Sequence, residues 1–351
     1  MKTEYIKLNP DHIDRDALKK GALLLKQGEV VAFPTETVYG LGANALDPRA
    51  VDKIFAAKGR PGDNPLIVHV AHPDQAISLT AEISPEAQAL MERFWPGPLT
   101  LIFPKSPIIP ANVTGGLDTV ALRMPQHPIA LGLIQEAGVP IAAPSANLSG
   151  KPSPTEGEHV WADLMGKIPL ILDGGEAQLG VESTVLDLTV HPPVILRPGG
   201  VTLEEIQRVI GAVYDGQDLQ SGETPRSPGM KYTHYAPEAD VIIVEGSEQE
   251  IAPLIMTNYQ RFSQEGKRIA LLVAEETAGQ LEHQVKPDYL EVLGSRKDLS
   301  LVAHRLFSAL RHADLYGVDL VLIEAFSDQG LGAAVMNRMR KAAGNQVIKS
   351  K

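Results

Sequence analysis

Two fixed positive charges, Lys58 and Arg60, lie in the stretch AAKGRPGDNPLIVHV at residues 56–70. A Pro-Gly turn follows them, and an apolar run that ends in His69 comes next. A single Lys or Arg is usually a solvated surface charge. A cation at the mouth of a strand that looks buried is costly unless it faces an anion. We therefore interpret Lys58 and Arg60 as candidates for binding a phosphate or a carboxylate.

Two arginines extend this pattern. Arg123 lies in TVALRMP and Arg197 in VILRPG, each in or at the end of an expected strand. The planar guanidinium group suits bidentate contact with a carboxylate or a phosphate. For each cation alone, a structural ion pair is the alternative. Several such residues arriving from separate strand ends predict a concave site for a polyanion.

Small polar residues follow a further strand in APSANLSG at 143–150, where Ser145 and Asn147 could bind a base, a ribose or a phosphate. The same residue types also cap turns for local reasons. No G-x-S-x-G elbow, phosphate loop or zinc pair is present. GLGANA at 40–45 matches the loose dinucleotide pattern, but we interpret it as a turn that requires glycine backbone angles. His69, on an apolar strand, is expected to be a hydrogen-bonded core histidine.

The elements that must position these residues alternate along the first two hundred residues. Apolar spacing predicts helices that include 14–29, 47–60, 84–95 and 202–211. Short β-branched runs predict strands that include 30–33, 65–70, 99–103, 119–124, 182–190 and 193–199, the last two as neighbours.

The composition of the sequence changes at about residue 211. Residues 211–237 are rich in Gly, Ser, Pro and polar residues and predict a linker. Two Tyr, a His and a Lys fall within 231–235, which is unusual for a plain spacer. The segment either packs as a loop on one domain or folds over a site. Regular alternation of strands and helices resumes after it and predicts a doubly wound parallel sheet. The expected domains are 1–210 and 238–351.

Composition limits the function classes. The chain has 351 residues, a formal net charge of −11 and no Cys. An acidic chain is not expected to have a broad nucleic-acid surface, although a local basic pocket is compatible with it. Absence of Cys excludes disulfides, a thiol nucleophile and thiolate metal sites. No secretory signal and no run of about 18 apolar residues is seen, so we expect a soluble cytoplasmic protein.

The order of several motifs resembles the YrdC-like family. They are FPTETVYGLG, KGRPGDNPL, ALRMP, APSANLSG, GVESTV and LRPG. SPGMKYTHYAP at 227–237 is similar to the linker of the family's long, two-domain form, and the C-terminal third resembles its second domain. The resemblance covers essentially the whole chain. It implies a twisted mixed-sheet catalytic domain with a large concave, positively charged cavity and a smaller Rossmann-like domain with a parallel sheet.

The activity that the resemblance implies is synthesis of L-threonylcarbamoyladenylate from L-threonine, bicarbonate and ATP, with release of pyrophosphate. Partner transferases then use this product to form N6-threonylcarbamoyladenosine at position 37 of tRNAs that read ANN codons. A carbamate must attack the α-phosphate, so two anions have to meet, and fixed positive charge and orientation matter more than a strong base. Mg²⁺ is expected with ATP, and no side-chain cluster is expected to hold a metal.

The resemblance also implies residue roles. Lys58 and Arg60 would cradle the phosphates as the catalytic cations. The rest of the nucleotide would be held by Asn64, Thr119, Ser145, Asn147, Ser153 and Arg197, with Tyr235 closing over it to exclude water. Threonine would be bound by Thr35, His69, Arg123, Ala143 and Ser183.

Two alternatives stay open. An RNA-binding module could grip a backbone with the same cations, although an acidic chain with few interleaved cations argues against it except as a weak tRNA contact beside catalysis. A carbamoyl-phosphate-handling domain of hydrogenase maturation shares the YrdC-like fold. It would bring acylphosphatase and zinc-finger segments, and a chain without Cys lacks them.

Overall fold

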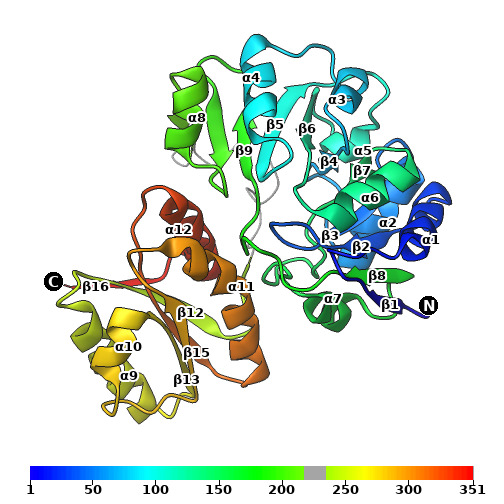
Figure 1. The fold of residues 1–351 in the computed structure, drawn as a ribbon. Coiled ribbons are helices and arrows are strands. Elements are labelled where there is room, and N and C mark those ends of the chain that lie inside the picture. The colour runs from blue at the N-terminus through cyan, green and yellow to red at the C-terminus, as the bar shows by residue number, and fades with distance from the viewer. Residues whose placement is uncertain (217–234, 351) are drawn as a thin grey trace. The chain divides into compact units, whose positions relative to one another are not determined.

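The computed structural model describes residues 1–216 and 235–350 (Figure 1). The chain divides into two compact units. Unit 1 comprises Met1–Ser149 and Ser153–Lys231, and unit 2 comprises Gly150–Pro152 and Tyr232–Lys351. Most of the predicted linker 211–237, namely 217–234, lies outside the described residues.

Unit 1 is built on one large mixed sheet. Its strands are β1 (Glu4–Lys7), β2 (Val31–Phe33), β3 (Gly40–Asn44), β4 (Ile67–His69), β5 (Leu99–Pro104), β6 (Thr119–Arg123), β7 (Ile141–Ala142), β8 (Leu170–Asp173), β9 (Thr184–Asp187), β10 (Val194–Arg197) and β11 (Tyr214–Asp215). They run in the order β1-β8-β2-β3-β7-β4-β6-β5-β9-β10-β11 with parallel and antiparallel neighbours. The expected pairing of the strands now labelled β9 and β10 is confirmed and is antiparallel.

The helices of unit 1 pack on this sheet in two separate cores. They are α1 (Arg15–Lys26), α2 (Pro48–Lys58), α3 (Asp74–Leu79), α4 (Pro85–Phe94), α5 (Ala111–Thr114), α6 (Pro128–Ala137), α7 (Gly157–Leu164) and α8 (Leu203–Ile210). One core joins α1 and α6 to the sheet, and α1 and α6 also lie against each other. The other contains apolar residues of α2, α3, α4, α7 and α8.

Local signals place the end of α2 where the site needs it. Asp47 caps the helix by accepting from the amide of Arg49, and Pro48 begins it. The helix ends at Lys58 because Gly59 adopts a left-handed conformation, with φ of 61°. The chain therefore turns directly after Lys58 and leads into the Arg60 loop.

The GLGANA segment is not the turn that the sequence suggested. It forms β3, and neither Gly40 nor Gly42 has a positive φ. Packing explains the glycine at position 42. A Cβ there would lie 2.7 Å from side-chain atoms of both Phe33 and Ile141. The glycine thus allows two large side chains to close over the strand.

Unit 2 is a doubly wound parallel domain, as the alternation of its segments predicted. Its elements are β12 (Asp240–Glu245), α9 (Ile251–Gln264), β13 (Ile269–Ala274), α10 (Glu275–Leu281), β14 (Tyr289–Gly294), α11 (Leu299–Leu315), β15 (Leu320–Glu324), α12 (Leu331–Ala342) and β16 (Val347–Lys349). The strand order is β14-β13-β15-β12-β16, and the pairings are parallel. Figure 1 shows α9 and α10 on one side of this sheet and α11 and α12 on the other.

Three residues from the middle of the chain complete unit 2. Arg311 on α11 donates from Nε and Nη2 to the carbonyl of Pro152. The amide of Ala236 donates to the carbonyl of Gly150 at 3.0 Å. In the part of the chain that the structure describes, no helix is long and apolar enough to cross a membrane.

Candidate active site

The candidate site of unit 1 rests on the adjacent strands β4 and β6. These strands are parallel, and His69 is the register partner of Arg123. Because side chains alternate along a strand, residues two positions earlier on each strand, Ile67 and Ala121, share this face. They belong to a small buried apolar cluster with Ile102 of β5. Polar groups at the strand ends therefore lie beside an apolar floor.

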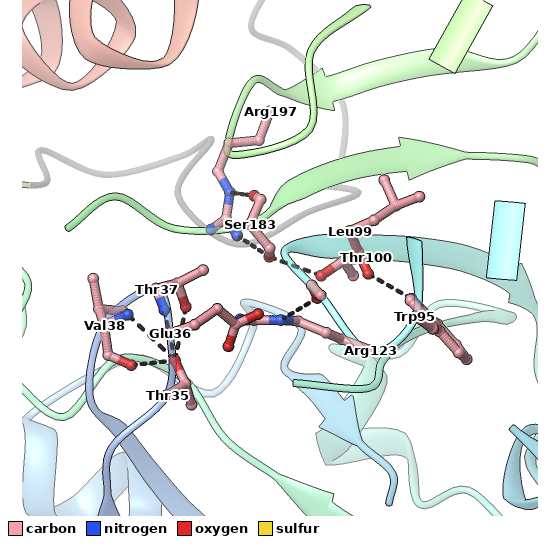
Figure 2. A network of polar contacts seen from close by, with 11 residues as sticks. Thr35, Glu36, Thr37, Val38, Trp95, Leu99, Thr100, Arg123, Ser183 and Arg197 are labelled. Atoms are coloured by element: carbon pink, nitrogen blue, oxygen red, sulfur yellow. Dashed lines mark hydrogen bonds and ion pairs between the residues drawn. The ribbon is translucent and has the colours of Figure 1, made fainter. Parts of the chain in front are cut away.

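Arg123 is buried and forms an ion pair with Glu36. Its Nη2 lies 2.7 Å from Oε1 of Glu36, and both side chains are at most 6% exposed. Its Nε donates to the carbonyl of Gly97 at 3.3 Å. Figure 2 shows the two side chains pointing toward each other from β6 and from the loop between β2 and β3. The guanidinium is thus held in a defined orientation.

The loop that carries Glu36 is held by the hydroxyl of Thr35. Thr35 Oγ1 donates to the carbonyl of Val38 at 2.6 Å and accepts from the amides of Thr37 and Val38. It also lies 2.8 Å from Thr37 Oγ1 (Figure 2). Thr35 was predicted to contact threonine, and the structure shows it organising the turn at Glu36.

Ser183 connects β5 to β10. Its Oγ lies 2.8 Å from Thr100 Oγ1. Arg197 donates from Nε to the main-chain carbonyl of Ser183 and from Nη2 to its hydroxyl, both at 3.1 Å (Figure 2). The structure brings together two residues, Ser183 and Arg197, that the resemblance placed on different substrates.

Lys58 links the KGRPGDNPL motif to the APSANLSG motif. Its Nζ donates to the carbonyls of Ser145 and Asn147, each at 2.6 Å, and lies 3.4 Å from Asn147 Oδ1. Ser145 in turn donates to Asn147 Oδ1 at 2.5 Å. Lys58 is only 3% exposed. An ammonium group has three protons to donate, and here three loop oxygens lie within reach of them.

Arg60 and Asn64 lie on the loop beyond α2. Arg60 is partly exposed, and its Nη2 lies 3.3 Å from the carbonyl of Pro65 and 3.5 Å from that of Asn64. Asn64 is fully buried, yet neither polar atom of its amide has a hydrogen-bond partner among the described residues. A buried amide in this state is costly, so Asn64 is a good candidate to bind a ligand.

Two buried histidines near the Glu36–Arg123 pair are neutral at physiological pH. Burial, reinforced by the charge of Arg123, lowers the pKa of His69 to about 3. Burial lowers the pKa of His127 to about 4, although Glu36 opposes the shift. Nδ1 of each ring has no hydrogen-bond partner within the described part of the chain. The expectation that His69 is a fully hydrogen-bonded core histidine is therefore wrong for this nitrogen.

The remaining predicted residues fall into three groups. Ser153 is buried and donates to Glu182 Oε1, and Ala143 is buried beside β4, where its amide donates to the carbonyl of Ile67. Thr119 begins β6 and is partly exposed. Tyr235 belongs to unit 2.

The ring of Tyr235 packs within unit 2. Its centroid lies 5.1 Å from that of Phe307, and the guanidinium of Arg338 lies 5.8 Å from it. The backbone of Tyr235 has a φ of 68°, which is uncommon for a residue with a side chain. Closure of Tyr235 over the nucleotide stays a prediction.

The sequence patterns gave no role to Glu36, Thr100, His127 or Glu182, although all four have buried polar side chains in the structure. Glu36 was visible as an acidic residue in the apolar-flanked motif FPTETVYGLG. The structure adds that it is the partner of Arg123. The site as a whole combines buried cations, hydroxyl and amide groups and neutral imidazoles. It can orient and neutralise an anionic substrate.

Two family models match the chain in succession. One, described as "Telomere recombination", matches residues 23–199. The other, described as "Threonylcarbamoyl-AMP synthase, C-terminal domain", matches residues 201–344. The fold and the site thus define a two-domain protein of the YrdC-like class.

Similar proteins narrow this class. Threonylcarbamoyl-AMP synthase from Pyrococcus abyssi is 52% identical over 97% of this chain and 97% of its own length. The enzyme of the same name from Bacillus subtilis is 54% identical over 95% of this chain and 94% of its own length. A crystal structure of P. abyssi Sua5 complexed with L-threonine matches with a TM-score of 0.94 and 50% identity, covering 99% of this chain and 100% of that one. The chain belongs to the threonylcarbamoyl-AMP synthase family and is an enzyme of this type.

Proposed function

We propose that this chain joins L-threonine, bicarbonate and ATP into L-threonylcarbamoyl-AMP and releases water, as the amine and bicarbonate form a carbamate, and pyrophosphate. The observation that carries the proposal is the buried Arg123, held beside Glu36 and the neutral His69 on a polar strand edge. A carbamate oxygen forms a bond to the α-phosphorus of ATP, and the bond from that phosphorus to the β-phosphate bridging oxygen breaks. Orientation and charge neutralisation dominate such a reaction.

Threonine is the substrate that the site around Arg123 fits. The guanidinium would bind its carboxylate. Ser183 and the unpartnered Nδ1 of His69 would receive its hydroxyl or amine, and Thr35 and Ala143 would shape the pocket. The P. abyssi Sua5 structure with L-threonine supports this choice of substrate.

ATP would occupy the region of the KGRPGDNPL motif at residues 58–66. Arg60 would contact the phosphates directly, because its side chain is partly exposed. Lys58 would contribute its positive charge to the nucleotide site, and it would also position the loop of Ser145 and Asn147. The other nucleotide contacts that we propose are Asn64, Thr119, Ser145, Asn147, Ser153, Arg197 and Tyr235.

Magnesium would arrive with the nucleotide. Among the described residues no group of three or more His, Cys, Asp or Glu side chains is placed to hold a metal ion. Mg²⁺ binds phosphate oxygens and retains several waters, so it does not need an all-protein cage. It would neutralise charge on the departing pyrophosphate.

The product would be passed to transferases that modify adenosine 37 of tRNAs reading ANN codons. A weak tRNA contact would accompany that transfer. We place the reaction in the cytoplasm, where ATP and these tRNAs are available.

The experiment is pyrophosphate release by the purified protein with ATP, Mg²⁺ and bicarbonate, with and without L-threonine, and with L-serine as the control. Release that requires both threonine and bicarbonate supports the proposal. Release that is indifferent to threonine points to another ATP-consuming enzyme. ATP binding without release would leave a nucleotide- or RNA-binding role, and removal of Mg²⁺ with EDTA tests the metal separately.

A further inference from the structure

The carboxylate of Glu36 is buried and poorly satisfied. Its side chain is 6% exposed. Neither oxygen has a hydrogen-bond donor within the described part of the chain, although Oε1 lies 2.7 Å from Arg123 Nη2 as an ion pair. An ionised carboxylate has about four lone-pair positions to fill. Burying one with a single ionic contact leaves a strong acceptor without a donor.

The backbone holds this carboxylate in place. The carbonyl of Glu36 accepts from the amide of Leu179 at 2.8 Å, and that of Thr37 accepts from Gly180 at 3.1 Å. The hydroxyl of Thr35 closes the turn around it. A charged group that is already held in place loses little conformational entropy when a ligand binds.

The charges near Glu36 favour a dipolar ligand. His69 and His127, whose pKa values are lowered to about 3 and about 4 by burial, are both neutral at pH 7. The paired charges at this point are therefore the guanidinium of Arg123 and the carboxylate of Glu36. An α-amino acid carries a carboxylate and an ammonium group separated by one carbon atom. A cation and an anion side by side are complementary to that pair of charges.

We propose that Glu36 is the residue that binds the α-ammonium group of the amino-acid substrate, while Arg123 binds its carboxylate. The ammonium group supplies the hydrogen-bond donors that Glu36 lacks. Glu36 then discriminates amino acids from hydroxy acids and other carboxylates of the same shape. This inference rests on the proposed function, since it takes threonine to bind at Arg123.

The test compares L-threonine with (R)-3-hydroxybutyrate, which keeps the carboxylate and the hydroxyl but lacks the amine. Affinities of the full chain for both are measured by ligand-observed NMR for wild type, Glu36→Gln and Arg123→Gln. Gln has the shape of Glu without its charge. We expect Glu36→Gln to weaken the binding of threonine about 10- to 100-fold, because a charge-assisted hydrogen bond is lost. We expect (R)-3-hydroxybutyrate to bind unchanged or more tightly, because Arg123 loses a competing anion.

Other patterns overturn the proposal. If Glu36→Gln weakened the binding of both ligands equally, Glu36 would serve only to position Arg123. If it strengthened the binding of both, Glu36 would compete with the substrate for Arg123. Steady-state kinetics adds a second readout: Glu36→Gln should raise the KM for threonine much more than it lowers kcat, and ATP affinity should stay at the wild-type value.

Failure of the proposed function looks different. If threonine does not bind at this site, wild type shows no threonine binding, or Arg123→Gln leaves both ligands unaffected. With the site in place, Arg123→Gln weakens both ligands. The two hypotheses are thus separated by the same set of measurements.

Discussion

Lys58 and Asn147 are joined through one ammonium group, which donates to the main-chain carbonyl of Asn147 at 2.6 Å and lies 3.4 Å from its side-chain oxygen. The residues are 89 positions apart. The contact fixes the end of α2 against the loop that follows β7. Lys58 is therefore both a positive charge and a structural tie, and the two roles can be separated experimentally.

Lys58→Met should lower both activity and stability. The apolar chain keeps much of the packing but leaves the carbonyls of Ser145 and Asn147 without their donor. We expect the free energy of unfolding of unit 1 to fall by about 1–3 kcal/mol, and threonine-dependent pyrophosphate release to be abolished. Urea unfolding followed by tryptophan fluorescence reports on unit 1 alone, because both Trp residues, Trp95 and Trp161, belong to it. An unchanged unfolding midpoint would contradict the structural role.

Arg60→Ala is the matched comparison. Arg60 is partly exposed, and its contacts to the carbonyls of Asn64 and Pro65 are at the long end of the hydrogen-bond range. We expect loss of threonine-dependent turnover with unfolding free energy within about 0.5 kcal/mol of wild type. Near-normal rates in this variant would remove Arg60 from the mechanism.

The stability of unit 1 should fall as the pH drops below about 6.5. In the folded state burial lowers the pKa of His69 to about 3, whereas in the unfolded chain the pKa of His69 is close to its ordinary value. The unfolded state therefore binds more protons between these values, and stability is lost as pH falls through this window by up to about 1.4 kcal/mol per pH unit. His69→Gln should flatten the slope between pH 6.5 and 4. His72→Gln, a change at an exposed side chain, is the control and should leave the slope as in wild type.

Gly42→Ala should destabilise unit 1 although Gly42 has an ordinary backbone conformation. The new Cβ would lie 2.7 Å from atoms of both Phe33 and Ile141. Overpacking of this kind costs about 1–3 kcal/mol. Gly62→Ala, where an added Cβ has no heavy atom within 4 Å, is the control for glycine replacement itself. Equal stabilities of the two variants would show that β3 adapts without cost.

Local patterns were sufficient to predict most elements. The helix at 14–29 and the strands at 65–70 and 119–124 appear as α1, β4 and β6 with slightly shorter bounds. Their apolar periodicity, caps and β-branched runs act within a few residues, so the chain itself displays them. The parallel sheet of unit 2 followed from the same alternation.

Partners distant in sequence could not be predicted in this way. Nothing local shows that Glu36 meets Arg123 or that Lys58 meets Asn147, because strand order decides both contacts. The glycine at position 42 was misread for the same reason. Its neighbours Phe33 and Ile141 come from other strands, and a pattern typical of a turn was the only local clue.

The three residues Gly150–Pro152 determine whether the two units can be expressed as separate polypeptides. The chain passes between the units at 149/150, at 152/153 and again at 231/232. The units are therefore interleaved in the polypeptide instead of strung end to end. Residues 232–351 expressed alone would lack the Pro152 carbonyl that Arg311 binds. A protease that cuts the later crossing alone would leave residues 150–152 on the other fragment, so that noncovalent contacts such as the one between Arg311 and the Pro152 carbonyl would be all that holds them in unit 2.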